Sequence, residues 1–412
     1  MYRISASLSV WIIFLISPII AVLYAFRYPK AYWVKNVIWM MVAFHGMTMP
    51  IIREGLDANR YKEALHKMAK EDLSFEGIVN ALYNDETRYV DVMQPMVTYL
   101  VSIFTANETF LFLVFGLIFG YFYSRNLWFL IQQSLKRKLD FYAWVLLIIF
   151  ALIVAFWQIN AFRFWTAAHI FFLGTIQIFY YKRQKGWLFI LLSLLTHYAF
   201  IIPVVLLVFH FFYRIPYQIL FFIFLATFSI SEVDFGALNE RLKSYTPSFL
   251  EHRVDAYVSE EYAEKRASKS ETRSWHAKFY GKALKWSIFV LIAFLYVKRK
   301  PVFGPYLFFG RLFSFTLLLY SFANIASMVP SGARYMTVTN LFAMGLLFLV
   351  YISVGKSLKM NRVLLILTPF LLFYGLVSLR SGADYMGIDL ILSNPLIASV
   401  LKSDIALIEF VK

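Results

Sequence analysis

Long runs of apolar residues without any charge alternate along this chain with short charged segments. Residues 10–26, 141–157 and 219–230 each form such a run. This pattern is typical of helices that cross a membrane, because in hydrocarbon each backbone polar group must be satisfied within its own helix. The pattern therefore predicts an all-α polytopic membrane protein.

The number of apolar runs predicts about 11–12 transmembrane helices, oriented so that short loops rich in Lys and Arg share the cytoplasmic side. Residues 95–105 are too short to span at about 1.5 Å per residue, so we expect them to lie at the outer surface or to dip into the membrane. The predicted spans are 8–26, 33–51, 110–131, 141–158, 164–181, 217–235, 283–298, 306–328, 335–352 and 362–379.

Residues 187–213 are best interpreted as a pair of short helices. If they crossed the membrane once, the basic clusters at 298–300 and 356–362 would fall outside. If they run up and back, with a bend near Thr196 and His197, every short basic loop falls inside. Such a break is tolerated only where it lines a cavity in the protein, so we expect a broken or re-entrant pair.

The charged segments divide the chain into outer regions around one integral membrane domain, residues 1–412. Residues 52–106 are expected to form a periplasmic loop with short helices, and 236–282 a second periplasmic loop. The tail, 380–412, contains an apolar stretch interrupted by Asn394-Pro395 and is expected to be periplasmic or interfacial.

Composition agrees with this class and excludes several kinds of site. Only 16% of the residues are charged, against about 25% in soluble proteins. The net charge of +16 is explained by cytoplasmic loops that face anionic lipid, so no nucleic-acid partner is expected. The absence of cysteine excludes disulfides and thiolate sites. No metal-ligand spacing and no phosphate-binding glycine loop is found, so we expect no metal and no cofactor.

The predicted topology gathers polar residues at the outer face. Arg163 and Arg334 each begin a predicted helix there, where the arginine charge adds to the positive end of the helix dipole and suits a phosphate or diphosphate. His197 is the candidate base, because imidazole titrates near neutral pH. Asp57 would stay ionised beside arginines, so it suits orienting them or binding the acceptor. The further candidates are Arg53, Arg60 and Tyr61.

Each candidate also has a purely structural interpretation. Arg163 and Arg334 are compatible with arginines that snorkel to the interface. His197 is compatible with a polar helix contact, and Asp57 with a loop residue or a helix cap.

Four short motifs follow one another along the chain: Asp57-Ala-Asn-Arg60-Tyr61, Arg163-Phe-Trp-Thr-Ala-Ala, Leu194-Leu-Thr-His197-Tyr-Ala and Gly332-Ala-Arg334-Tyr335. In order and spacing they resemble the EpsG family of Wzy-like polysaccharide polymerases, and the similar layout covers roughly residues 1–380. Two places depart from the family pattern. Tyr198-Ala199 stands where the family often has Ser near the His, and Phe164-Trp165 is bulkier than the small residues that follow the family's Arg.

The resemblance implies an enzyme of the bacterial inner membrane with a GT-C-like architecture and its active site facing the periplasm. Such an enzyme transfers a glycan from polyprenyl (undecaprenyl) diphosphate to a sugar hydroxyl of another lipid-linked repeat unit, without a metal. Its partners would be the lipid-linked donor and acceptor, membrane lipid and a chain-length regulator. The resulting assignment is catalysis by His197 and Asp57, diphosphate binding by Arg163, Arg334 and Arg60, and acceptor or sugar binding by Tyr61, Arg53 and Tyr335.

Two other classes remain open on the sequence. An O-antigen ligase or another lipid-linked-sugar glycosyltransferase would share the lipid diphosphate but use a different acceptor. A non-enzymatic flippase or transporter of lipid-linked glycans would be expected to place cations along a transit path and to contain internal repeats, which are not evident here.

Overall fold

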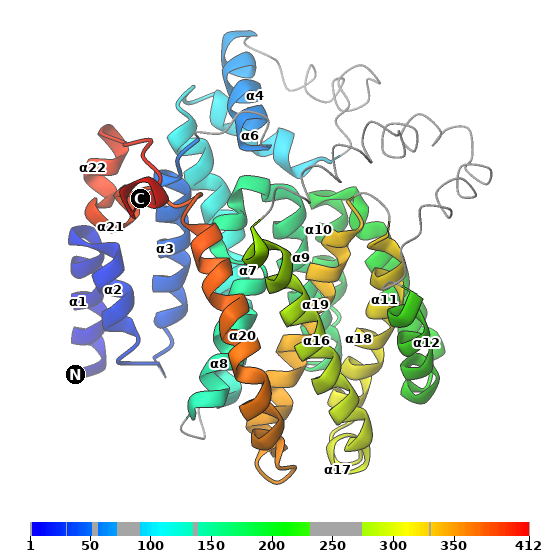
Figure 1. Cartoon of the computed structure of the whole chain (residues 1–412). Coiled ribbons are helices and arrows are strands. Elements are labelled where there is room, and N and C mark those ends of the chain that lie inside the picture. The colour runs from blue at the N-terminus through cyan, green and yellow to red at the C-terminus, as the bar shows by residue number, and fades with distance from the viewer. Residues whose placement is uncertain are drawn as a thin grey trace, which may run out of the picture. The chain divides into compact units, whose positions relative to one another are not determined.

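The described part of the chain is helical throughout. The computed structural model describes residues 2–29, 31–51, 57–71, 91–134, 139–230, 274–328 and 331–411. Within these ranges the only β pairing is an isolated bridge between Gly387 and Ala406. Six helical segments are long and apolar enough to cross a membrane: Glu108–Ser134, Phe141–Phe179, Trp275–Val297, Leu307–Ala326, Ala333–Gly355 and Met360–Gly382. The prediction of a polytopic, all-helical membrane protein is confirmed (Figure 1).

The chain forms two compact units. Unit 1 comprises Met1–Lys138, Val154–Val204 and Ser378–Lys412, and unit 2 comprises Leu139–Ile153 and Val205–Val377. Each unit is therefore built from segments that are distant in sequence.

Unit 1 contains short helices as well as long ones. Its first predicted span, 8–26, is broken into two helices, because Pro18 lacks an N–H and disfavours helical backbone at Ser17, which is extended (φ −152°, ψ 104°). The helices of unit 1 are α1 (Tyr2–Ile16), α2 (Pro18–Ala25), α3 (Val34–Thr48), α4 (Asp57–Glu71), α6 (Met93–Ser102), α7 (Glu108–Ser134), η1 (Phe156–Ala161), α9 (Phe162–Phe179), α10 (Gly186–Thr196), η2 (Tyr198–Phe200), α21 (Asp389–Leu392), α22 (Pro395–Val400) and α23 (Leu407–Val411).

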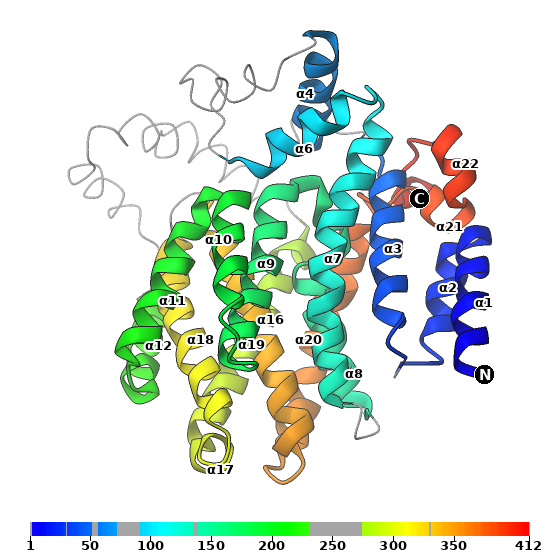
Figure 2. The same ribbon diagram turned by 180° about the vertical axis from the view of Figure 1, so that it is seen from behind.

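Helices α3 and α7 pack closely because glycine lines their contact, and the two lie side by side in Figure 2. A Cβ atom at Gly116 would lie 2.8 Å from the backbone oxygen of Val42. A Cβ atom at Gly120 would lie 2.9 Å from the Cβ atom of Val42. Small residues four apart let two helix backbones approach in this way in membrane proteins.

Gly116→Ala is therefore expected to destabilise unit 1 by about 1–3 kcal/mol, because the added methyl group meets backbone and the two helices must separate. Thermal unfolding of the purified protein in detergent measures this effect. Gly281→Ala is the matched control, since a Cβ atom there meets nothing within 4 Å. Unfolding of Gly116→Ala at the wild-type temperature would contradict the close α3–α7 packing.

The long helices of unit 1 define two opposite ends. Helices α7 and α9 run in the same direction, since Phe115 stacks on Phe162 near their starts (4.1 Å between ring centroids) and Phe129 contacts Tyr180 near their ends (5.2 Å). The basic segment 182–185 follows α9, so it lies at the end where α7 finishes. The start of α9 lies at the opposite end of unit 1.

Unit 2 gathers several of its inter-helix segments at one end. Its helices are α8 (Phe141–Ile153), most of α11 (Ile201–Tyr213), α12 (Tyr217–Ile230), α16 (Trp275–Val297), α17 (Arg299–Phe303), α18 (Leu307–Ala326), α19 (Ala333–Val350), a π-helical turn (Tyr351–Gly355) and most of α20 (Met360–Gly382). Tyr217 contacts Phe303 with ring centroids 5.3 Å apart, and Lys356 forms an ion pair with Asp140 (3.6 Å). Helices α18 and α19 are antiparallel, as the hydrogen bond from Tyr320 to Asn340 shows. The segments before α8 and α12 and after α16 and α19 therefore share one end.

The expected helix break within 187–213 is present. Helix α10 ends at Thr196, and α11 starts at Ile201 after an extended His197 and the short turn η2. Whether this pair is re-entrant in a bilayer remains a prediction. Helix α16 begins at Trp275, within the predicted second outer loop 236–282, and residues 231–273 lie outside the described ranges.

This arrangement allows a direct topology experiment. We expect a label at 236–282 to be reachable from the periplasm and a label at 299–304 to be reachable only from the cytoplasm. Because the chain has no cysteine, Ser268→Cys and Lys300→Cys can each be tested with a membrane-impermeant thiol reagent on intact spheroplasts. Labelling of Cys introduced at 300 but not at 268 would reverse the proposed orientation.

Candidate functional site

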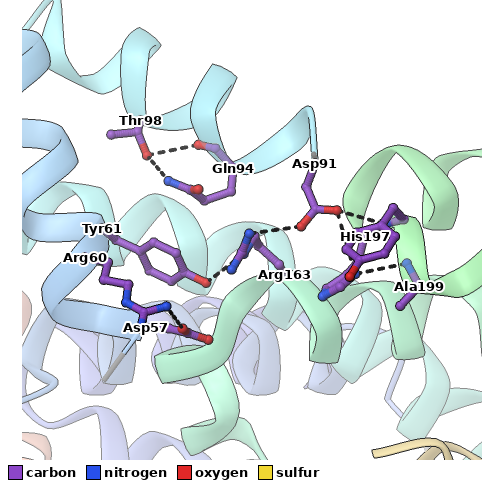
Figure 3. Close-up of polar contacts among 10 residues, drawn as sticks. Asp57, Arg60, Tyr61, Asp91, Gln94, Thr98, Arg163, His197 and Ala199 are labelled. Carbon is purple, nitrogen blue, oxygen red and sulfur yellow. Dashed lines mark hydrogen bonds and ion pairs between the residues drawn. The ribbon is translucent and has the colours of Figure 1, made fainter. Parts of the chain in front are cut away.

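The polar residues of unit 1 converge at the end where α9 starts. Helix α4, the Asp91 segment before α6, the first turn of α9 and the break after α10 meet there (Figure 3). The basic segment 182–185 belongs to the opposite end of the same unit. The site therefore lies where the sequence analysis expects the outer face.

Asp91 is the central acid of this site and is 2% exposed. Its Oδ1 atom accepts a hydrogen bond from the backbone N–H of Tyr198 (2.8 Å). Its Oδ2 atom accepts one from Nη1 of Arg163 (3.1 Å). Burial raises the pKa of Asp91, although the Tyr198 N–H and the Arg163 charge oppose the shift. One carboxylate thus joins the start of α9 to the break after α10.

Arg163 is the second residue of α9 and is held at two atoms. Its Nε atom donates to the hydroxyl of Tyr61 (3.2 Å), while Nη1 donates to Asp91. Burial of Tyr61 raises its pKa to about 12, so the phenol stays protonated at neutral pH. The Arg163 side chain remains 30% exposed. Among the described residues no acceptor lies at Nη2, which leaves guanidinium N–H groups for an anionic ligand.

His197 occupies the break itself. Its backbone is extended (φ −155°, ψ 119°), and its Nδ1 atom accepts a hydrogen bond from the backbone N–H of Ala199 (3.2 Å). Nδ1 lies 3.7 Å from Oδ1 of Asp91. The ring of Phe164 stands edge-on to the imidazole, with centroids 5.3 Å apart. A backbone N–H can only donate, so the neutral ring carries its proton on Nε2.

Asp57 and Arg60 lie on the first turn of α4, beside Tyr61. Their side chains form an ion pair at 3.7 Å, with Arg60 71% exposed and Asp57 25% exposed. An exposed pair of this kind contributes at most about 1 kcal/mol to stability. Because this pair adds little stability, its position beside Arg163 and Tyr61 (Figure 3) points to a role in the site.

The structure brings together five of the residues predicted for the site: Asp57, Arg60, Tyr61, Arg163 and His197. Arg334 and Tyr335 belong to unit 2, where Arg334 is exposed and Tyr335 packs edge-on against Phe322 (5.1 Å). Arg53 lies outside the described residues.

Asp91 was missed by the sequence analysis, which placed it within the outer loop 52–106 without a role. A signal is present in retrospect, since Asp91 is the last charged residue before an uncharged stretch, 92–107. An acid directly before a short apolar helix that dips into the membrane would be costly unless it were paired. The described ranges contain no group of three or more His, Asp or Glu residues that could hold a metal ion.

Comparison with known proteins identifies no relative: no family model, no curated protein and no solved structure matches this chain. The resemblance to the EpsG family therefore depends on the four sequence motifs, and the function proposed below depends on those motifs and on the geometry of the site.

Proposed function

We propose that this chain is a membrane glycosyltransferase of the Wzy-like polymerase type. It transfers a glycan from polyprenyl diphosphate to a sugar hydroxyl of a second lipid-linked repeat unit at the periplasmic face of the bacterial inner membrane. The main support for the proposal is the position of the Arg163 guanidinium at the start of a membrane helix. Tyr61 and Asp91, which are distant from Arg163 in sequence, hold it there by hydrogen bonds.

The Arg163 guanidinium of this site suits a diphosphate leaving group. As the glycosidic bond breaks, negative charge develops on the diphosphate, and donors fixed in advance stabilise it best. Arg163 supplies such donors from a helix N-terminus, where the helix dipole adds to its charge. Asp91 and Tyr61 fix the guanidinium before the ligand arrives, so little reorganisation is required on binding.

The proposed reaction is a displacement at the anomeric carbon of the donor sugar. The acceptor oxygen forms a bond to this carbon, and the bond from the carbon to the phosphate oxygen breaks with its electron pair remaining on the diphosphate. The acceptor hydroxyl also loses a proton, which a basic side chain must take. His197 and Asp57 are the candidates from the sequence.

Polymer growth on purified protein tests this function. The protein in nanodiscs would receive the lipid-linked repeat unit of its own pathway, and products would be separated by gel electrophoresis. A ladder of increasing length supports a polymerase. Transfer only to lipid A core would instead indicate a ligase, and movement across vesicles without transfer a flippase.

A further inference from the structure

The tautomer of His197 limits what this residue does in the reaction. The Ala199 N–H bond occupies the lone pair of Nδ1. In the neutral ring Nε2 therefore carries a proton and has no lone pair to accept one. In this state the imidazole is a hydrogen-bond donor at Nε2 rather than a base.

Asp91 connects the segment that carries His197 to Arg163. Its Oδ2 atom holds Arg163, and its Oδ1 atom holds the Tyr198 N–H that directly follows His197. A second bond, from the Val92 N–H to the backbone oxygen of Leu195 (3.3 Å), ties the same two segments together. In Figure 3 the His197 ring and the Arg163 guanidinium lie on either side of the Asp91 carboxylate.

We infer that His197 donates a hydrogen bond from Nε2 to the diphosphate, that Asp91 positions it together with Arg163, and that Asp57 takes the proton of the acceptor hydroxyl. This inference rests on the proposed function and reverses the roles that the sequence suggests for His197 and Asp57. In the balanced step the diphosphate leaves with the bonding pair, stabilised by Arg163 and His197, and the acceptor proton moves to an Asp57 oxygen.

Asp57 has the properties that this role requires. Its carboxylate is partly exposed, and among the described residues its only ionic partner is Arg60, at a distance longer than a hydrogen bond. Asp91, by contrast, has both oxygens engaged. Asp57 is therefore the acid of the site whose oxygens remain able to accept.

Two substitutions of His197 separate a donor from a base. The amide nitrogen of Gln reaches the place of Nε2, whereas that of Asn reaches only the place of Nδ1. We expect His197→Gln to keep polymerase activity within about 10-fold of wild type and His197→Asn to lose about 100-fold or more, as for the loss of one oxyanion donor. Binding of undecaprenyl diphosphate in detergent should weaken in the Asn variant and persist in the Gln variant.

The pH profile gives a second readout that a purely structural role would not change. The titratable and charged groups around His197 are Asp91 before α6, Arg163 on α9 and the adjacent Tyr198. If His197 is not the base, His197→Gln keeps the acidic limb of the wild-type profile. Asp57→Asn should lose about 100-fold or more in turnover while still binding undecaprenyl diphosphate.

The outcomes distinguish this inference from the proposed function. The donor role of His197 would be overturned if the Gln and Asn variants were equally inactive with unchanged binding, or if His197→Gln lost the acidic limb. In either case polymerase activity of the wild type would still support the proposed function. If the Asn variant fails to fold, the activity and pH profile of the Gln variant still decide. Wild-type protein that neither binds undecaprenyl diphosphate nor makes polymer would overturn both.

Discussion

Asp91→Asn is expected to lose about 100-fold or more of polymerase activity, because a misplacement of about 1 Å in a catalytic group has an effect of that size. The amide oxygen of the variant can still accept the Tyr198 N–H. Its NH₂ group would face Nη1 of Arg163, so that two donors meet and the guanidinium loses its anchor. Product formation per folded molecule, measured on gels after size-exclusion chromatography, is the appropriate readout.

Folding of the same variant is expected to weaken by about 1–3 kcal/mol, because the partly buried Arg163 donor loses its acceptor. Burial raises the pKa of Asp91, so the folded protein retains this proton at a pH where the unfolded chain has lost it. Between the ordinary value of 3.8 and the raised pKa, the folded state binds more protons, and wild-type stability falls as the pH rises through this interval. The Asn variant cannot titrate here and therefore lacks this pH dependence of stability.

Glu71→Gln is the matched control for Asp91→Asn. Glu71 forms an exposed pair with Lys67 on the far end of α4 (3.8 Å), and such pairs contribute little. Full polymer from Asp91→Asn, with the control also active, would remove Asp91 from the site.

Periodicity and charge were enough to predict the helical membrane class and several helix boundaries. The break near His197 was predicted because an up-and-back pair keeps every short basic loop on the cytoplasmic side. The structure places α10 and α11 on either side of this residue. The break within the first predicted span was not foreseen, because hydropathy does not register the backbone effect of Pro18. The backbone chemistry of a single proline thus determined where these two helices divide, which hydropathy averaged over many residues does not show.

Contacts between distant segments account for most of what the sequence could not predict in the site. Arg163 and Tyr61 are 102 residues apart, and Arg163 and Asp91 are 72 residues apart. No local pattern connects them, because the packing of α4 and α9 around α7 brings them together. The tautomer of His197 likewise depends on the backbone geometry at Ala199, which residue identity does not specify.

Arg163→Lys is expected to lose about 100- to 1000-fold of activity, as for other groups that stabilise a developing anion. An ammonium is a compact charge without the planar fork, so it cannot contact the Tyr61 hydroxyl and Asp91 in the observed geometry while also presenting donors to a diphosphate. Arg183→Lys is the matched control, because Arg183 lies at the opposite end of unit 1. Arg334→Lys is also expected to lose most activity, and full polymer from this variant would exclude Arg334 from diphosphate binding.

A double-mutant cycle decides whether Asp91 acts through Arg163. If it does, adding Asp91→Asn to Arg163→Lys should lower activity far less than Asp91→Asn does alone, because residues in one network are not additive. If the two losses multiply, each side chain contacts the substrate or the fold independently. Retained polymer in Arg163→Lys would show that the guanidinium fork is not needed, and the diphosphate proposal would then lose its central observation.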